Sequence, residues 1–216
     1  MEDQPEMARL PTQLKPFAQK IAASKLAHVD VRPVIGPTTQ WNSKLRGVPY
    51  YPKDKPWPLD VDAKPLVMLV QINFSEMPAL TGYPPEGILQ IYISAGYLPE
   101  KQMWGMRNDS EYNTDQECRT DQSYFRTIYF PRVSRDAEDL ITATPAVEFD
   151  DDYGFPALDE ALLTFAEGSS YVRPEDYRFR RFFGQDRDGG IGNFYIRPED
   201  LARRDFSKVM YYWDFC

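Results

Sequence analysis

The fold is organised around one run of residues, Leu66-Val67-Met68-Leu69-Val70-Gln71-Ile72-Asn73-Phe74. It is nearly continuous in apolar residues, which is the pattern of a strand covered on both faces of a sheet. A second apolar run, Ile88-Leu89-Gln90-Ile91-Tyr92-Ile93, follows after the turn sequence Pro84-Pro85-Glu86-Gly87. The short separation favours antiparallel pairing of the two strands. We therefore expect residues 66–74 to form a central strand.

The segment of residues 36–65, called the cover segment below, precedes this strand and is rich in proline and aromatic residues. Its rings are too costly to leave together in water, and prolines stiffen the chain between them. We expect the segment to wrap over the core as an ordered loop. Its large aromatic residues are Trp41, Tyr50, Tyr51 and Trp57.

Polar residues interrupt both apolar strands. Strand alternation puts Gln71 and Asn73 on one face with Leu69, and it puts Gln90 and Tyr92 together on one face of the next strand. If the two faces coincide, these residues form a polar row inside the sheet. Buried amides need partners. The favoured reading is that the row ties the cover segment to the sheet, and the alternative is that it binds a ligand.

The N-terminal region predicts a helix followed by a strand. Leu14, Phe17 and Ile21 recur at helical spacing, which indicates an amphipathic helix lying on the domain. Residues 28–35 alternate like a strand but contain Pro33, and proline cannot donate to a central ladder. This strand should therefore lie at the edge of the sheet.

Further strands are expected at residues 124–130 and 161–166. Tyr195-Ile196-Arg197-Pro198-Glu199-Asp200 reads as a strand that feeds a helix, with proline in the first turn and acids at the N-terminus, and Tyr171 to Asp176 is an earlier copy. The fold class is α+β, with a mostly antiparallel sheet core, an N-terminal amphipathic helix and short C-terminal helices. Because nothing forces a division, we expect residues 1–216 to form one domain.

The charge and hydropathy patterns limit the classes of partner. A formal net charge of −8 repels phosphate backbones, and we expect the short basic cluster from Arg178 to Arg181 to line a solvated helix face. No apolar run approaches the about 20 residues that span a bilayer, and no signal peptide is recognisable. We expect a cytoplasmic protein with reduced Cys118 and Cys216, and with neither nucleic-acid nor membrane partners.

Conventional histidine, cysteine or metal chemistry is not expected. His28 is the only histidine and sits in an alternating strand, and two distant cysteines provide no paired zinc ligands. The acids from Glu148 to Asp152 do not match the spacing of a calcium-binding loop. The glycines from Gly189 to Gly192 lead into a strand, whereas a phosphate-binding loop leads into a helix. We expect no metal and no cofactor.

Several blocks of sequence stand in a characteristic order. They are Ser43 to Asp54, Leu69 to Pro78, Gly87 to Ile93 and the C-terminal block from Gly190 to Asp214. Together they resemble the bacterial YwqG-like family, a domain of unknown function. The resemblance implies a sheet-rich α+β fold and a cytoplasmic bacterial setting, and it supplies no catalytic residues.

One region departs from that family's pattern. The resemblance implies that a further strand precedes the C-terminal glycine block. Here Phe182 to Arg187 is followed at once by Asp188-Gly189-Gly190. We therefore expect an internal shortening near residues 184–190 that leaves the sheet incomplete and exposes an edge.

Two functions remain open from the sequence, which carries no signal for the oligomeric state. The favoured one is a non-enzymatic binding or protein-interaction module, such as an inhibitor or immunity partner, with an aromatic interaction surface around Tyr97, Trp104 and Tyr112. The alternative is a carboxylate-dependent hydrolase that acts on a sugar or a similar polar substrate with acids from residues 148–160.

Overall fold

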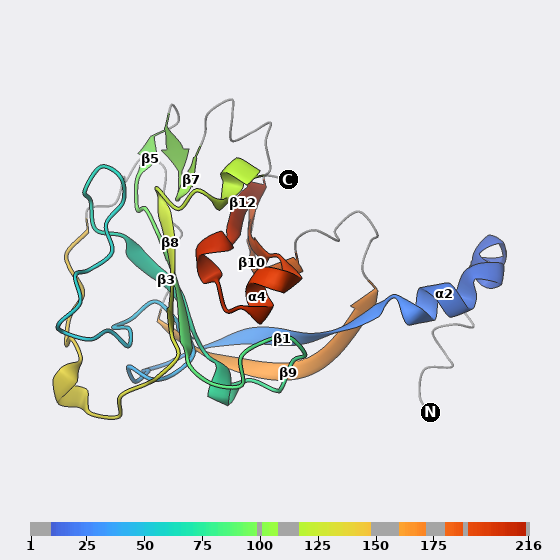
Figure 1. Cartoon of the computed structure of the whole chain (residues 1–216), viewed down its shortest axis with the longest axis horizontal. Helices are drawn as coiled ribbons and strands as arrows, with labels where there is room; N and C mark the ends of the chain where they lie inside the picture. The colour runs from blue at the N-terminus through green and yellow to red at the C-terminus, as the bar shows by residue number, and fades with distance from the viewer. Residues whose placement is uncertain are drawn as a thin grey trace.

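The computed structural model describes residues 10–98, 101–107, 117–147, 160–171, 180–187 and 190–214. Its central sheet consists of β1 (Lys25–Ile35), β2 (Lys44–Leu45), β3 (Val67–Asn73), β4 (Ile88–Ile93), β8 (Phe125–Phe130) and β9 (Ala161–Tyr171). The order of these six strands is β1-β9-β2-β3-β4-β8, and every neighbouring pair is antiparallel (Figure 1).

Smaller elements complete the α+β fold that the sequence predicted. One three-stranded sheet contains β10 (Arg180–Arg187), β11 (Gly190–Ile196) and β12 (Met210–Asp214), and another contains β5 (Tyr97–Leu98), β6 (Gln102–Met103) and β7 (Met106–Arg107). The helical elements are η1 (Thr12–Phe17), α2 (Ala18–Ala23), η2 (Phe74–Glu76), η3 (Glu117–Thr120), η4 (Ala137–Asp139), α4 (Pro198–Ala202) and η6 (Phe206–Lys208).

The prediction of a central, doubly covered strand is confirmed. β3 pairs with β2 on one side and with β4 on the other. On one face Val70 and Ile72 belong to a core that includes Phe194 of the C-terminal sheet. On the other face Leu66 and Met68 pack with the aromatic residues of the cover segment.

The alternation along β3 is not regular. The pairing of β3 with β4 shifts between Met68 and Val70, so the face on which each side chain lies changes at Leu69. Leu69 packs on the C-terminal side, whereas Met68 packs under the cover segment. The prediction that Gln71 shares a face with Leu69 is therefore wrong, and the bulge brings Gln71 directly opposite Gln90.

The cover segment is packed as predicted. Tyr50 and Tyr51 are buried, and the Trp57 indole donates to the Leu66 carbonyl at 2.9 Å. The ring of Tyr51 lies edge-on to the ring of Tyr92 on β4, with centroids 6.4 Å apart. These contacts explain why a loop with so many prolines is ordered.

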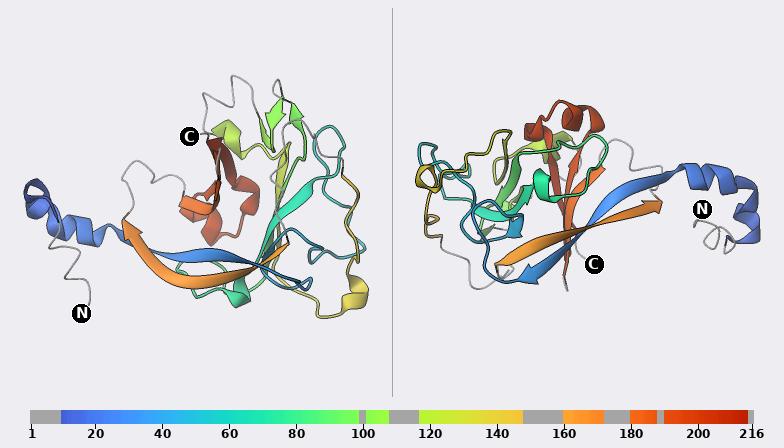
Figure 2. Two further views of the ribbon diagram at one scale, coloured as in Figure 1. Left: turned by 180° about the vertical axis from the view of Figure 1, so that it is seen from behind. Right: turned by 90° about the horizontal axis from the view of Figure 1, so that it is seen from below.

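β1 occupies an edge of the central sheet, as Pro33 predicted. It pairs with β9 over the full length of both strands, whereas β2 covers only Ala161 and Leu162 of β9. The two strands therefore leave the sheet as a ribbon that carries η1 and α2 away from the body (Figures 1 and 2).

Residues 10–24, called the arm below, contain η1 and α2 at the end of this ribbon. The prediction that this helix lies on the domain is wrong, because η1 and α2 bury no residue. Leu14 and Phe17, which were expected to face the core, are 43% and 52% exposed. Figure 2 shows the arm at the far end of the ribbon in both further views.

The C-terminal region differs in part from its prediction. α4 begins at Pro198 with Glu199 and Asp200 in its first turn, as expected, whereas the earlier copy of this motif falls mostly outside the described residues. Arg180 and Arg181 were expected on a helix and instead begin β10, which pairs with β11. β11 is paired on both sides, and Gly184 to Arg187 pair with Gly190 to Asn193 within this sheet.

Candidate functional site

Gln71 and Gln90 form the centre of the polar row and are both fully buried. The Gln90 Nε2 atom donates to Oε1 of Gln71 at 2.7 Å and to the Tyr50 carbonyl at 2.5 Å. The Tyr92 hydroxyl donates to Oε1 of Gln90 at 2.7 Å, and burial raises the pKa of Tyr92 well above its ordinary value. The structure thus brings three of the four predicted residues into one network.

The Gln71 amide uses all of its hydrogen-bonding capacity. Its Nε2 donates to the carbonyls of Gln40 and Asn42, both at 2.8 Å. Its Oε1 accepts from the Tyr50 amide at 2.8 Å as well as from Gln90. An amide has two donors and two acceptor positions, and all four are filled by protein. These contacts support the reading that the row ties the cover segment to the sheet.

Lys44 extends the row onto β2 and was not foreseen from the sequence. It lies opposite Gln71, its side chain is fully buried, and its ammonium donates to the carbonyls of Thr39, at 2.8 Å, and Val48. Burial lowers its pKa to about 8, although the Glu160 carboxylate acts in the opposite direction. A charged residue in a two-residue strand has no periodicity that could have predicted its burial.

Asn73, the fourth predicted residue, lies at the end of β3 and has a different environment. Its Nδ2 donates to the Trp41 carbonyl at 3.0 Å, and its Oδ1 accepts from the Ser75 amide at 3.1 Å, which caps η2. Asn73 and Ser75 also line an open pocket of about 300 Å³. This pocket lies between η2 and the chain that follows β8.

Arg132 and Arg135 also line this pocket, together with Glu86 and Gly87. Both arginines are exposed, and within the described part of the chain neither guanidinium makes a hydrogen bond or an ion pair. Neither arginine was predicted from the sequence. They follow Pro131 directly after a strand, which marks a turn but does not indicate which side chains meet there.

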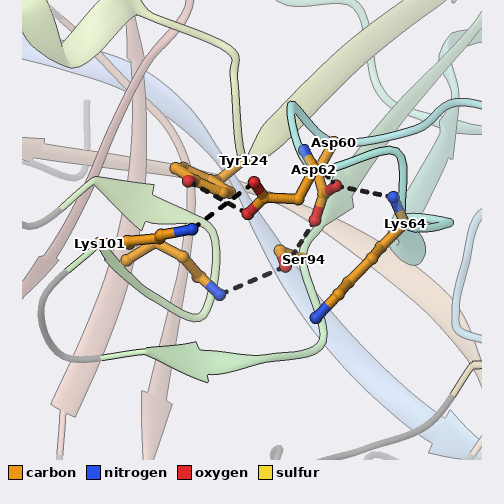
Figure 3. Close-up of polar contacts among 7 residues, drawn as sticks. Asp60, Asp62, Lys64, Ser94, Lys101 and Tyr124 are labelled. Carbon is orange, nitrogen blue, oxygen red and sulfur yellow. Dashed lines mark hydrogen bonds and ion pairs between the residues drawn. The ribbon is translucent and has the colours of Figure 1, made fainter.

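Asp60 and Asp62 form an acidic pair near the end of β4 (Figure 3). Asp60 is buried, and its Oδ1 accepts from the amides of Asp62 and Lys64 at 3.0 and 2.8 Å, while its Oδ2 accepts from the Ser94 hydroxyl at 3.3 Å. Asp62 lies 3.7 Å from the ammonium of Lys101 and accepts from the Tyr124 hydroxyl at 3.4 Å. Because each carboxylate is engaged by protein groups, we assign the pair to loop stabilisation.

The predicted aromatic interaction surface is described only at Trp104. Its ring is half-buried against Trp213, with centroids 5.3 Å apart, and its carbonyl accepts from the Tyr211 hydroxyl at 3.1 Å. The structure does not describe the side chain of Tyr97 or any part of Tyr112. An interaction surface at these residues stays a prediction.

The groups that the sequence offered for catalysis include His28 and the acids of residues 148–160. His28 lies on β1, where its Nε2 is 3.2 Å from the Asp30 carboxylate. The acids of residues 148–159 lie outside the described residues, whereas the Glu160 carboxylate accepts from the backbone amide of Thr38 at 3.2 Å and from its hydroxyl. Within the described ranges, no group of His, Cys, Asp and Glu side chains could hold a metal ion, and no helix could cross a bilayer.

Comparison with known families identifies the relatives of this chain. The model of a domain of unknown function, DUF1963, matches residues 43–188 and 185–216. The chain belongs to the DUF1963 family. The two matched segments overlap at residues 185–188, within the region where the sequence predicted a shortening. They leave the arm and β1 outside the match. No curated protein matches the chain, and the narrower YwqG-like assignment stays a prediction.

Proposed function

We propose that this DUF1963 protein is a non-enzymatic protein-interaction module, and that its arm docks into an apolar groove on a partner protein. The observation that carries the proposal is the exposure of Leu14 and Phe17 on an element that projects from the body. An amphipathic element whose apolar side chains face water is the usual ligand of a hydrophobic groove.

Charge indicates which kind of groove the arm fits. Lys15, Lys20 and Lys25 are the only residues with a full charge from Leu10 to Val29, whereas the whole chain has a net charge of −8. The arm is therefore a locally basic segment on an acidic protein. A groove with an acidic rim would attract the basic arm, whereas the acidic remainder of the chain would repel such a groove. This difference favours docking through the arm alone.

The local stability of the arm agrees with a docking role. η1 and α2 have six residues each, and helices this short are marginal in water without packing. Beyond the pair of Val31 and Phe165, which packs against the core, the described part of the ribbon is two-stranded, and such a ribbon gains little stability by itself. Binding to a partner would supply the packing that the body does not provide.

The polar network of the body favours binding over catalysis. The Gln71 amide is saturated by protein groups, and Asp60 is held by backbone amides, so neither is poised to act on a substrate. The aromatic surface at Tyr97, Trp104 and Tyr112 remains a second candidate contact, and a hydrolase that uses residues 148–160 remains the alternative. The single domain and the cytoplasmic bacterial setting are part of the same proposal.

The proposal can be tested by co-purification of the full chain from its native cells, followed by mass spectrometry. We expect a specific protein to be recovered with the wild type and lost with the Leu14→Asp/Phe17→Asp variant. Val61→Asp is the matched control, because Val61 is 63% exposed and lies outside the arm. Equal recovery of the same proteins with all three chains would contradict docking through the arm. If light scattering instead shows a homo-oligomer that the arm variant abolishes, the occupant is a second copy and the hetero-partner is excluded.

A further inference from the structure

We propose that the pocket between η2 and the turn after β8 binds a small organic monoanion, with a carboxylate held by Arg132 and Arg135. Its volume of about 300 Å³ lies at the lower end of the range for ligand sites. A pocket of this size suits a small ligand. The site is separate from the arm and does not depend on the function proposed above.

The arginines sit on a backbone that is held in place before any ligand arrives. Between them in the sequence, the amide of Ser134 donates to the Tyr50 hydroxyl at 2.9 Å, and its carbonyl accepts from the Trp41 indole at 2.7 Å. Both rings belong to the cover segment; Tyr50 lies in its hydrophobic core and Trp41 packs against that core. The backbone of the turn is thus held on both sides of Ser134, which reduces the entropy lost when a ligand orders the guanidiniums.

The acids nearest to these arginines in the sequence do not neutralise them. The Asp136 carboxylate accepts from the Glu138 amide at 2.9 Å and caps η4, and the Asp139 carboxylate accepts from the Ser134 hydroxyl at 3.3 Å. Two guanidiniums that line one pocket, and that pair with no carboxylate among the described residues, are suited to bind an added anion. Arginine donates to carboxylates in a planar, bidentate geometry.

Glu86 determines the class of anion. It lines the same pocket as the two arginines, so the formal charge of the site is positive by one. A monoanion balances this charge, whereas a phosphate dianion would also be repelled by the Glu86 carboxylate. Glu86 is an acceptor and favours a hydroxyl or ammonium donor on the ligand, and the Ser75 hydroxyl offers a further polar contact. The ligand class is therefore a carboxylate with neighbouring donors, such as a sugar acid.

The test is an NMR titration of the full chain with D-gluconate, with neutral sorbitol and with inorganic phosphate. We expect saturable shifts of the Ser75, Gly87 and Val133 amides with gluconate, and none with sorbitol. Arg132→Ala/Arg135→Ala should weaken gluconate binding by about tenfold or more, since each arginine supplies charge-assisted hydrogen bonds. Arg32→Ala, an exposed arginine on β1, is the charge-matched control and should leave the affinity unchanged.

Two further outcomes separate the parts of this proposal. Glu86→Gln should raise the affinity for phosphate relative to gluconate, and an unchanged ratio would refute the assigned role of Glu86. Absence of saturable gluconate shifts, or equal binding by the double arginine variant with its fold intact, would overturn the site. Neither result bears on the arm, because none of the substituted pocket residues lies within residues 10–24.

Discussion

The Nε2 atom of Gln90 donates a hydrogen bond to Oε1 of Gln71 at 2.7 Å, between two side chains that have no exposure to solvent. The same two amides bind the Tyr50 amide and carbonyl. One cross-strand pair therefore joins β3 and β4 to the cover segment. Since buried amides are costly when unpaired, this pair specifies where the cover segment lies.

Replacement of Gln71 by leucine should destabilise the protein by about 2–4 kcal/mol, because it leaves the Gln40 and Asn42 carbonyls and the Tyr50 amide without their partner. Urea unfolding monitored by tryptophan fluorescence measures the change. Gln19→Ala, at an exposed position on the arm, should shift the midpoint very little. A loss below about 0.5 kcal/mol for Gln71→Leu would show that the network does not hold the cover segment.

Lys44 should make stability depend on pH in the alkaline range. Burial lowers its pKa in the folded state to about 8, from an ordinary value of 10.5. Between these values the unfolded chain binds more protons, so the Lys44 contribution to the free energy of unfolding rises with pH. The full effect is about 3 kcal/mol. Below pH 8 this contribution is at its least favourable and constant.

The measurement compares the wild type with Lys44→Met from pH 7 to 10. We expect the stability of the wild type to rise relative to that of the variant across this window. Lys55→Met, at an exposed position, should give a curve parallel to that of the wild type. Parallel curves for Lys44→Met as well would show that folding does not lower the pKa of Lys44.

Gly87 should tolerate no side chain. Its φ is +97°, and a Cβ would lie 2.7 Å from the Tyr129 hydroxyl oxygen and 2.8 Å from the Phe130 carbonyl oxygen. Gly87→Ala should cost about 2 kcal/mol or more in thermal or urea unfolding. Gly36→Ala is the matched control, because nothing lies within 4 Å of its Cβ position, and it should be neutral or slightly stabilising. Equal effects of the two substitutions would argue against this turn geometry.

Deletion of residues 1–24 should leave the stability of the body almost unchanged. No residue of η1 or α2 is buried, and no residue of the arm belongs to either hydrophobic core. We expect the melting temperature to change by no more than about 2 °C. A decrease of 10 °C or so would show that the arm packs on the body, and the docking proposal would lose its basis.

The central strand, its partner and the edge strand were predictable because hydrophobic continuity and Pro33 report burial and pairing directly. The face of Gln71 was not predictable, since the bulge at Leu69 depends on how β3 meets β4. The exposure of Leu14 and Phe17 was missed for a similar reason. Helical periodicity identifies an apolar face but does not say whether the same chain covers it.

Tertiary contacts also limited what could be predicted of the candidate sites. The polar row could be found because amides within an apolar strand are conspicuous, and the structure brought Gln71, Gln90 and Tyr92 together. The pocket at Arg132 and Arg135 could not, because its walls come from η2 and from the turn after β8. Lys44 was hidden in a similar way, since only tertiary packing buries its amine.

The most direct test of arm docking is a competition experiment with the partner recovered by co-purification. A synthetic peptide of residues 8–25 is titrated into the complex of full chain and partner, beside a peptide with Leu14→Asp and Phe17→Asp. Docking through the arm predicts that the natural peptide displaces the full chain, that high salt weakens the displacement, and that the substituted peptide has no effect. A complex that persists at saturating concentrations of the natural peptide would contradict the account.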